Sequence, residues 1–80
     1  MKIKVKDATD EQLIKYTENN IRELDGDFEK TPYYKCVVIR DKWGDGKWCE
    51  VQIYGIMLLH NRKLYDMDLD IRNEEFIEVA

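Results

Sequence analysis

Apolar and polar residues alternate along two stretches of the chain, a pattern typical of β-strands with one face in a core. Residues 2–6 alternate lysine with Ile and Val. Residues 64–72 alternate apolar side chains with charged ones, among them Asp66, Asp68 and Asp70. Because successive side chains of a strand point to opposite faces, both stretches predict half-buried strands.

After the first of these stretches, apolar residues recur at the three- and four-residue spacing of a helix. Thr9 with Gln12 three residues later fits a capping box, which predicts a helix start. Gly26 can adopt the backbone conformation that ends a helix. We therefore expect one amphipathic helix over residues 10–24. The face that it should bury consists of Leu13, Ile14, Thr17, Ile21 and Leu24.

A hairpin is predicted after a connector at residues 28–32. Residues 33–40 are rich in aromatic and β-branched side chains, and the glycines of residues 44–46 indicate a turn. A three-residue loop pairs Val37 with Ile53, whereas a two-residue loop would set two acidic residues opposite each other. Since like charges across a hairpin are unfavourable, we expect the three-residue loop. Odd-numbered positions then face the helix and even-numbered ones face away.

Residues 76–79 predict a short last strand, which completes the expected architecture. The chain should form a single small globular domain over residues 1–80, of the α+β class. One amphipathic helix would pack on a curved, mostly antiparallel sheet of four to five strands, in the order β-α-β-β-β-β.

Composition excludes several classes of protein. With 38% charged and 44% hydrophobic residues, the chain is too apolar for a disordered protein and too charged for a membrane span. Its 17 acidic against 13 basic residues, a net charge of −4, argue against direct nucleic-acid binding. No secretory signal pattern precedes the first strand, so we expect a cytoplasmic protein, in the host cytoplasm if a phage encodes it.

The residues suited to metal binding or nucleophilic catalysis are few and scattered. Cys36, Cys49 and His60 match no zinc spacing, and the expected register places the two cysteines on opposite faces as free thiols. An enzyme built on either cysteine would need a nearby base, for which His60 is the one histidine. We expect no catalytic residue, no cofactor and no metal.

Two acidic groups are candidates for binding a partner. Asp66, Asp68 and Asp70 should share one strand face at a spacing of about 6.6–6.8 Å, similar to the phosphates of a nucleic-acid strand. They form either a mimic of that backbone or a solvated face that discourages edge pairing. Asp25 and Asp27 lie in a second acidic stretch at the end of the helix, which is either a second binding strip or an exposed connector.

An apolar stripe on the outer side of the sheet is the third candidate, because one helix cannot cover both faces. Tyr and Trp on such a stripe are typical of binding hot spots. The alternative is that the C-terminal segment with Phe76 covers it. The even-numbered positions concerned are Cys36, Val38, Trp48, Tyr54, Ile56 and Leu58.

These features favour a small acidic, non-enzymatic binding module with a protein partner. We expect a phage-type inhibitor, similar in action to anti-CRISPR or anti-restriction proteins, that occludes a basic surface of a nucleic-acid-handling enzyme. The alternative is a self-associating structural or regulatory subunit, a homodimer through the outer sheet face. The partner-binding residues predicted for this module are Asp66, Asp68, Asp70, Trp48, Tyr54, Ile56, Leu58, Asp25 and Asp27.

Overall fold

The structure, a computed structural model, describes residues 1–79 and has one helix and two antiparallel sheets. The elements are β1 (Lys2–Lys4), the 3-10 turn η1 (Val5–Asp7), α1 (Asp10–Asp25), β2 (Phe28–Ile39), β3 (Trp48–Leu58), β4 (Lys63–Arg72) and β5 (Phe76–Glu78). The larger sheet has the order β2-β3-β4, and β1 pairs with β5 in a separate ribbon. The α+β class is confirmed, with two sheets in place of the single one expected.

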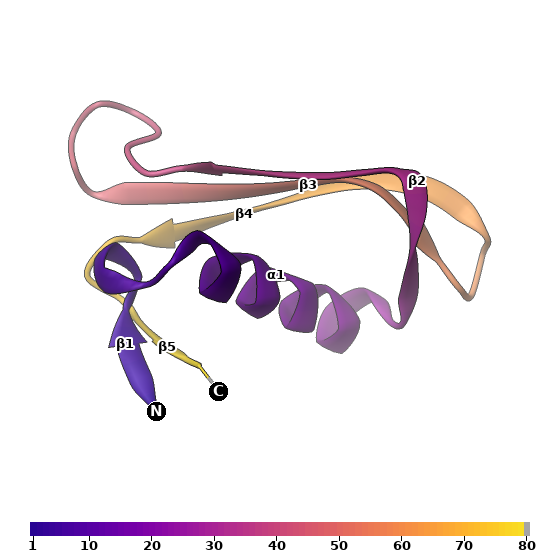
Figure 1. Ribbon diagram of the computed structural model, residues 1–80, viewed down its shortest axis with the longest axis horizontal. Helices are drawn as coiled ribbons and strands as arrows, with labels where there is room; N and C mark the ends of the chain where they lie inside the picture. Colours follow the sequence, from indigo (N-terminus) through magenta and orange to yellow (C-terminus); the bar gives the residue numbers. More distant parts are fainter. Residues whose placement is uncertain (80) are drawn as a thin grey trace.

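The helix and the β1–β5 ribbon lie on the same side of the three-stranded sheet (Figure 1). No other helix or strand of residues 1–79 lies on the opposite side (Figure 1). The core is therefore one layer between α1 and one sheet face. Val51 and Ile53 from the central strand are fully buried in it, together with Leu13 from the helix and Ile77 from the ribbon. No helix in residues 1–79 is long and apolar enough to cross a membrane.

The helix begins at the predicted capping box. Gln12 donates its backbone N–H to Thr9 Oγ1 at 3.1 Å, and Thr9 donates its own N–H to Gln12 Oε1 at 2.9 Å. Of the predicted apolar face, Leu13, Thr17 and Ile21 are buried and Ile14 is half-buried. Leu24 is 79% exposed, so its expected burial is wrong.

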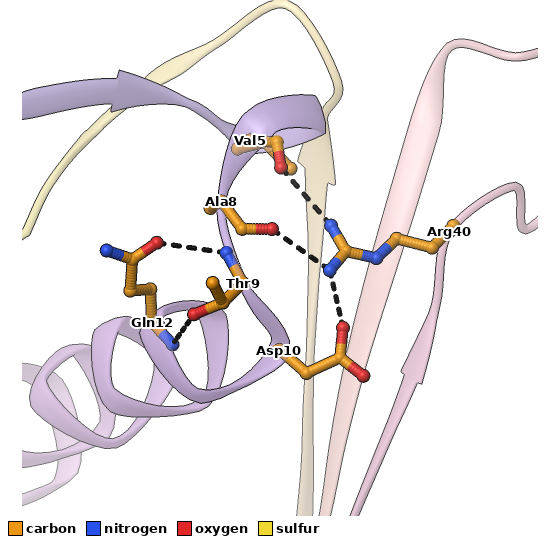
Figure 2. A network of polar contacts seen from close by, with 6 residues as sticks. All are labelled: Val5, Ala8, Thr9, Asp10, Gln12 and Arg40. Atoms are coloured by element: carbon orange, nitrogen blue, oxygen red, sulfur yellow. Dashed lines mark hydrogen bonds and ion pairs between the residues drawn. The ribbon is translucent and has the colours of Figure 1, made fainter.

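The Arg40 side chain joins the end of β2 to the segment that precedes the helix (Figure 2). Its guanidinium donates to the carbonyl oxygens of Val5 at 3.4 Å and Ala8 at 3.0 Å, and forms an ion pair with Asp10. A guanidinium supplies several donors in a fixed fork, which lets one side chain hold three groups at once.

We predict that Arg40→Lys lowers the free energy of unfolding by about 1–2 kcal/mol, because an ammonium keeps the charge but cannot reproduce the fork. Urea denaturation followed by circular dichroism measures the change. Lys15→Arg, on the exposed surface of α1, is the control and should leave the midpoint nearly unchanged. Equal stability of Arg40→Lys and the wild type would show that the fork adds nothing.

The pairing of β2 with β3 differs from the expected register by one residue. Val38 lies opposite Val51 and Cys36 opposite Ile53, where the three-residue loop would have placed Val37 opposite Ile53. The reason is a longer connection over residues 40–47, which is stabilised by its own hydrogen bonds rather than by a tight turn. Two aspartates accept backbone N–H groups within it, and Lys42 donates its N–H to the Trp48 carbonyl.

This one-residue shift moves every β2 side chain to the other face of the sheet. Cys36 and Val38 pack against the core, so their predicted outward direction is wrong. Val37 and Ile39 take the outward positions instead. Cys36 and Cys49 are free thiols, as predicted, but both lie on the helix side rather than on opposite faces.

A bulge in β3 changes the direction of the side chains that follow it. Ile53 lies opposite Met67 and Ile56 opposite Tyr65, so Tyr54 and Gly55 together oppose Asp66. Past the bulge, even-numbered residues face the helix.

Ile56 is fully buried and Leu58 is 4% exposed, and their predicted place on an outer stripe is therefore wrong. The predicted connector at residues 28–32 is instead part of β2, which starts at Phe28, opposite Leu58 of β3.

Candidate functional site

The outer face is the side of the three-stranded sheet away from α1. Its central row comes from β3 and alternates with buried side chains such as Cys49, Val51 and Ile53. Together, registers and burial assign to the outer face Val37 and Ile39 from β2, Trp48, Glu50, Gln52 and Tyr54 from β3, and Asp66, Asp68 and Asp70 from β4. Of the predicted stripe, Trp48 and Tyr54 remain, and the face is polar along its middle.

A chain of hydrogen bonds runs along β3 on this face. The Tyr54 hydroxyl donates to Gln52 Oε1 at 2.6 Å, and Gln52 Nε2 donates to Glu50 Oε1 at 2.8 Å. Lys42, from the loop between β2 and β3, forms an ion pair with the other Glu50 oxygen. Glu50 is only 3% exposed among these neighbours, and the hydrogen bond from Lys42 lowers the pKa of its carboxyl group.

The three aspartates of β4 share the outer face, but they have different partners. Asp66 Oδ1 accepts the N–H of the bulge residue Gly55 at 3.2 Å. Asp70 Oδ1 lies 3.2 Å from Lys42 Nζ. Asp68 lies opposite Gln52, with a carboxylate oxygen within 4.8 Å of one from Glu50. The interaction with Glu50, followed by burial and the other nearby negative charge, raises the pKa of Asp68. The three aspartates therefore differ: Asp66 accepts a hydrogen bond from the bulge, Asp70 is ion-paired with Lys42, and Asp68 lies beside other carboxylates.

Carboxylates of Glu50, Asp68 and Asp70 lie close enough to act on one charged group. One oxygen atom from each lies within 4.8 Å of the others. Lys42 contacts two of them, so one positive charge meets three negative ones when all three are ionised. We call these three acids the acidic triad; its surplus of negative charge attracts a further cationic group.

We predict that Asp68→Asn raises the free energy of unfolding at pH 7, by less than about 1 kcal/mol because solvent screens this exposed group. The raised pKa of Asp68 means that its favourable contribution is present below the ordinary pKa of Asp and is lost as pH rises through the folded-state value. The amide donates to Glu50 without adding charge. Urea denaturation at pH 3 and pH 7 checks this: the gain should shrink at pH 3, and a destabilised variant at pH 7 would contradict it.

An aromatic hollow lies at the bulge end of the outer face. Its volume is about 470 Å³, and it is lined by Tyr33, Lys35, Tyr54, Gly55, Leu64, Tyr65 and Asp66. Tyr33 is 75% and Leu64 60% exposed, so large apolar surface is open to solvent here. Lys35 lies over the Tyr54 ring, 5.5 Å from its centre. Exposed apolar surface therefore lies directly beside Asp66, the first of the three aspartates of β4.

The opposite end of the outer face carries the two tryptophans. Trp43 and Trp48 pack edge to face with ring centres 5.5 Å apart, and the Arg72 guanidinium lies 4.9 Å from the centre of the Trp48 ring. Such contacts stabilise the end of the hairpin. Trp48 is half-buried by them, whereas Trp43 is exposed.

The structure does not bring Asp25 and Asp27 to the outer face. Asp25 ends α1, on the other side of the sheet, and Asp27 precedes β2. Both are exposed, and the Asp27 carbonyl accepts the N–H of Leu59 from the turn between β3 and β4. Their place in the fold is that of a connector at the helix end, separate from the acidic triad.

A half-buried polar cluster between α1 and β2 contains Cys36. The thiol donates to the Tyr34 hydroxyl at 3.1 Å, and this hydroxyl donates to Glu18 Oε2 at 2.5 Å. Lys30 Nζ lies 3.2 Å from the same Glu18 oxygen. Burial is the main cause that raises the pKa of Tyr34. The cluster fixes the helix to β2, and His60, in the β3–β4 turn, takes no part in it.

Sequence reasoning missed Lys42, Glu50 and Gln52. The alternation of β3 already carried a signal for the last two, since they share a period of two with Trp48 and Tyr54. Lys42 had no such signal, because it reaches the site from an irregular loop.

No protein-family model, no curated protein and no solved structure matches the chain.

Proposed function

We propose that the protein is a non-enzymatic binding module whose outer face docks on a basic surface of a partner protein. The carrying observation is Asp68, whose carboxylate lies within 4.8 Å of those of Glu50 and Asp70 and forms no ion pair with a lysine or arginine of residues 1–79. A basic side chain from a partner would supply the missing charge. Local features that oppose stability are common where a surface serves binding.

Apolar contact area supports the same face. Tyr33, Leu64 and Tyr54 surround the aromatic hollow beside Asp66. Interfaces combine such aromatic anchors with charged groups that steer the encounter and select the partner. Charge supplies specificity here, and the hollow supplies desolvated area.

We propose that the partner is a nucleic-acid-handling enzyme and that the protein inhibits it, as phage-encoded anti-CRISPR or anti-restriction proteins do. Enzymes of this class carry basic grooves that track phosphates, and a strand of evenly spaced carboxylates is complementary to them. The module would act by steric and electrostatic occlusion of such a groove.

A homodimer through the outer face is the competing proposal. In a two-fold symmetric interface the same patch meets itself, so a dimer centred on the acidic triad would bring the triads of both copies together. Like charges brought together at an interface oppose association. The charge distribution therefore favours a foreign, basic partner.

The test is a pull-down with the tagged protein from a nuclease-treated bacterial lysate at about 0.1 M and 0.5 M salt, where Debye lengths are about 10 and 4 Å. We expect a basic nucleic-acid-handling protein to be retained at low salt and lost at high salt. Asp68→Asn should retain about threefold less of it, because an exposed ion pair contributes up to about 1 kcal/mol, which is about fivefold at most. Glu11→Gln, with the same change in net charge on the helix side, should retain as much as the wild type.

Equal retention by both variants, or retention that salt does not change, would contradict the proposal. Recovery of the protein alone, with a concentration-dependent dimer in sedimentation, would favour the homodimer instead.

A further inference from the structure

We infer that the free edge of β4 receives an extended segment of the partner as an added strand, in which Lys or Arg alternates with apolar residues. This inference rests on the proposed function and specifies how the basic partner binds. Strand addition at a sheet edge is a recurring mode of peptide recognition, in which backbone hydrogen bonds give affinity and alternate side chains give specificity.

The backbone of β4 is paired on one side only. Within residues 1–79 it pairs with β3 and with no other strand. The N-terminal segment reaches the chain only beyond β4, where Lys6 donates its N–H to Asn73 and Val5 donates to Glu75. Between Leu64 and Asp70, the outer row of N–H and C=O groups therefore has no strand beside it.

The other edge of the sheet, β2, is less suited to adding a strand. Pro32 lacks an N–H group, and pairing with β3 is irregular between Lys30 and Lys35. Edge strands with proline and irregular pairing resist the addition of a further strand. β4 has no proline and presents a continuous edge of ten residues.

The two faces of β4 determine the side chains of the added strand. Asp66, Asp68 and Asp70 lie on the outer face, so neighbouring residues on that face should be Lys or Arg. On the helix side, β4 presents side chains that are half-buried and pack against the core: Tyr65, Met67 and Leu69. Apolar residues of an added strand would extend that core and cover these side chains.

The same charges exclude a second copy of β4. Antiparallel pairing of two β4 edges keeps both outer faces on one side of the joined sheet, so aspartates would lie opposite aspartates. Like charges directly across a pair of strands destabilise it. The edge is thus closed to self-association and open to a basic strand.

The experiment measures binding of short fluorescent peptides to the full-length protein at about 0.1 M salt by anisotropy. The probes are a nine-residue peptide that alternates Lys and Val, the same peptide N-methylated at every Lys, and the same peptide N-methylated at every Val. A peptide that alternates Glu and Val is the charge control. In a strand, the N–H groups of alternate residues point to the same edge, so each methylated peptide has one blocked edge.

We expect the Lys-Val peptide to bind, the Glu-Val peptide not to bind, and only one of the two methylated peptides to lose about tenfold or more in affinity. Asp68→Asn should weaken the Lys-Val peptide about threefold, and Glu11→Gln should leave it unchanged. Amide hydrogen exchange should slow at residues 64–70 of β4 and not in β2.

Equal binding of both methylated peptides would overturn strand addition while leaving a basic partner in place. Failure of every Lys-containing peptide to bind would also overturn the inference, and the pull-down described above would then decide the proposed function separately.

Discussion

Replacing Gly55 by alanine is expected to lower the free energy of unfolding by about 2–5 kcal/mol, of which about 1–2 kcal/mol comes from its left-handed backbone and about 1–3 kcal/mol from overpacking. Gly55 has a φ of +74°, which L-residues with a Cβ rarely adopt. A Cβ at this position would also lie 2.5 Å from the Tyr33 carbonyl carbon, which is a backbone atom and cannot relieve the clash by a change of rotamer. The bulge brings the β3 and β2 backbones this close, and Thr31 Oγ1 fixes the approach by donating to the Gly55 carbonyl at 2.8 Å.

Gly44→Ala separates the two contributions. Its φ of +73° is nearly the same, but nothing lies within 4 Å of a Cβ there. Urea denaturation of both variants should therefore show a loss of only about 1–2 kcal/mol for Gly44→Ala. If the two variants were equally destabilised, the close packing at the bulge would make no contribution to the free energy of unfolding.

Replacing Ile56 by aspartate is expected to unfold the protein at neutral pH. Ile56 is fully buried in the core between the sheet and α1. The change removes about 1.5–3 kcal/mol of apolar burial and places an unpaired charge in the core at a cost of several kcal/mol. Together these approach the whole stability of a domain of this size, on the order of 4–12 kcal/mol.

Leu64→Asp is the matched control on the outer side of the same bulge. Leu64 is 60% exposed, so the aspartate stays in water and the stability should change by about 0.5 kcal/mol or less. Far-ultraviolet circular dichroism at 25 °C checks both variants. A folded Ile56→Asp variant would contradict the burial of this side chain in the core.

Local signals predicted the helix and β4 closely, whereas β2 begins at Phe28 rather than at residue 33, and β1 ends at Lys4 rather than at residue 6. The Thr9–Gln12 capping box predicted the helix start to the residue, and the alternation in residues 64–72 predicted β4 almost to its observed bounds. These features depend on neighbours a few residues apart, which the sequence displays directly.

The candidate site was predictable only in part. The alternation of β4 placed Asp66, Asp68 and Asp70 on one face, and the structure confirms this shared face. The sequence carried no sign that Asp66 caps the bulge or that Lys42 reaches Glu50 and Asp70, because both contacts depend on how three strands are aligned.

Strand registers divide what the sequence determined from what the tertiary structure decided. The kind of each element, and the set of residues that share a face within one uninterrupted strand segment, follow from local chemistry. Which face each set occupies depended on a loop that pairs Ile39 with Glu50 and on a bulge at Gly55. With a side-chain period of two, a shift of one residue exchanges the faces, so these two long-range features turned Cys36, Val38, Ile56 and Leu58 inward.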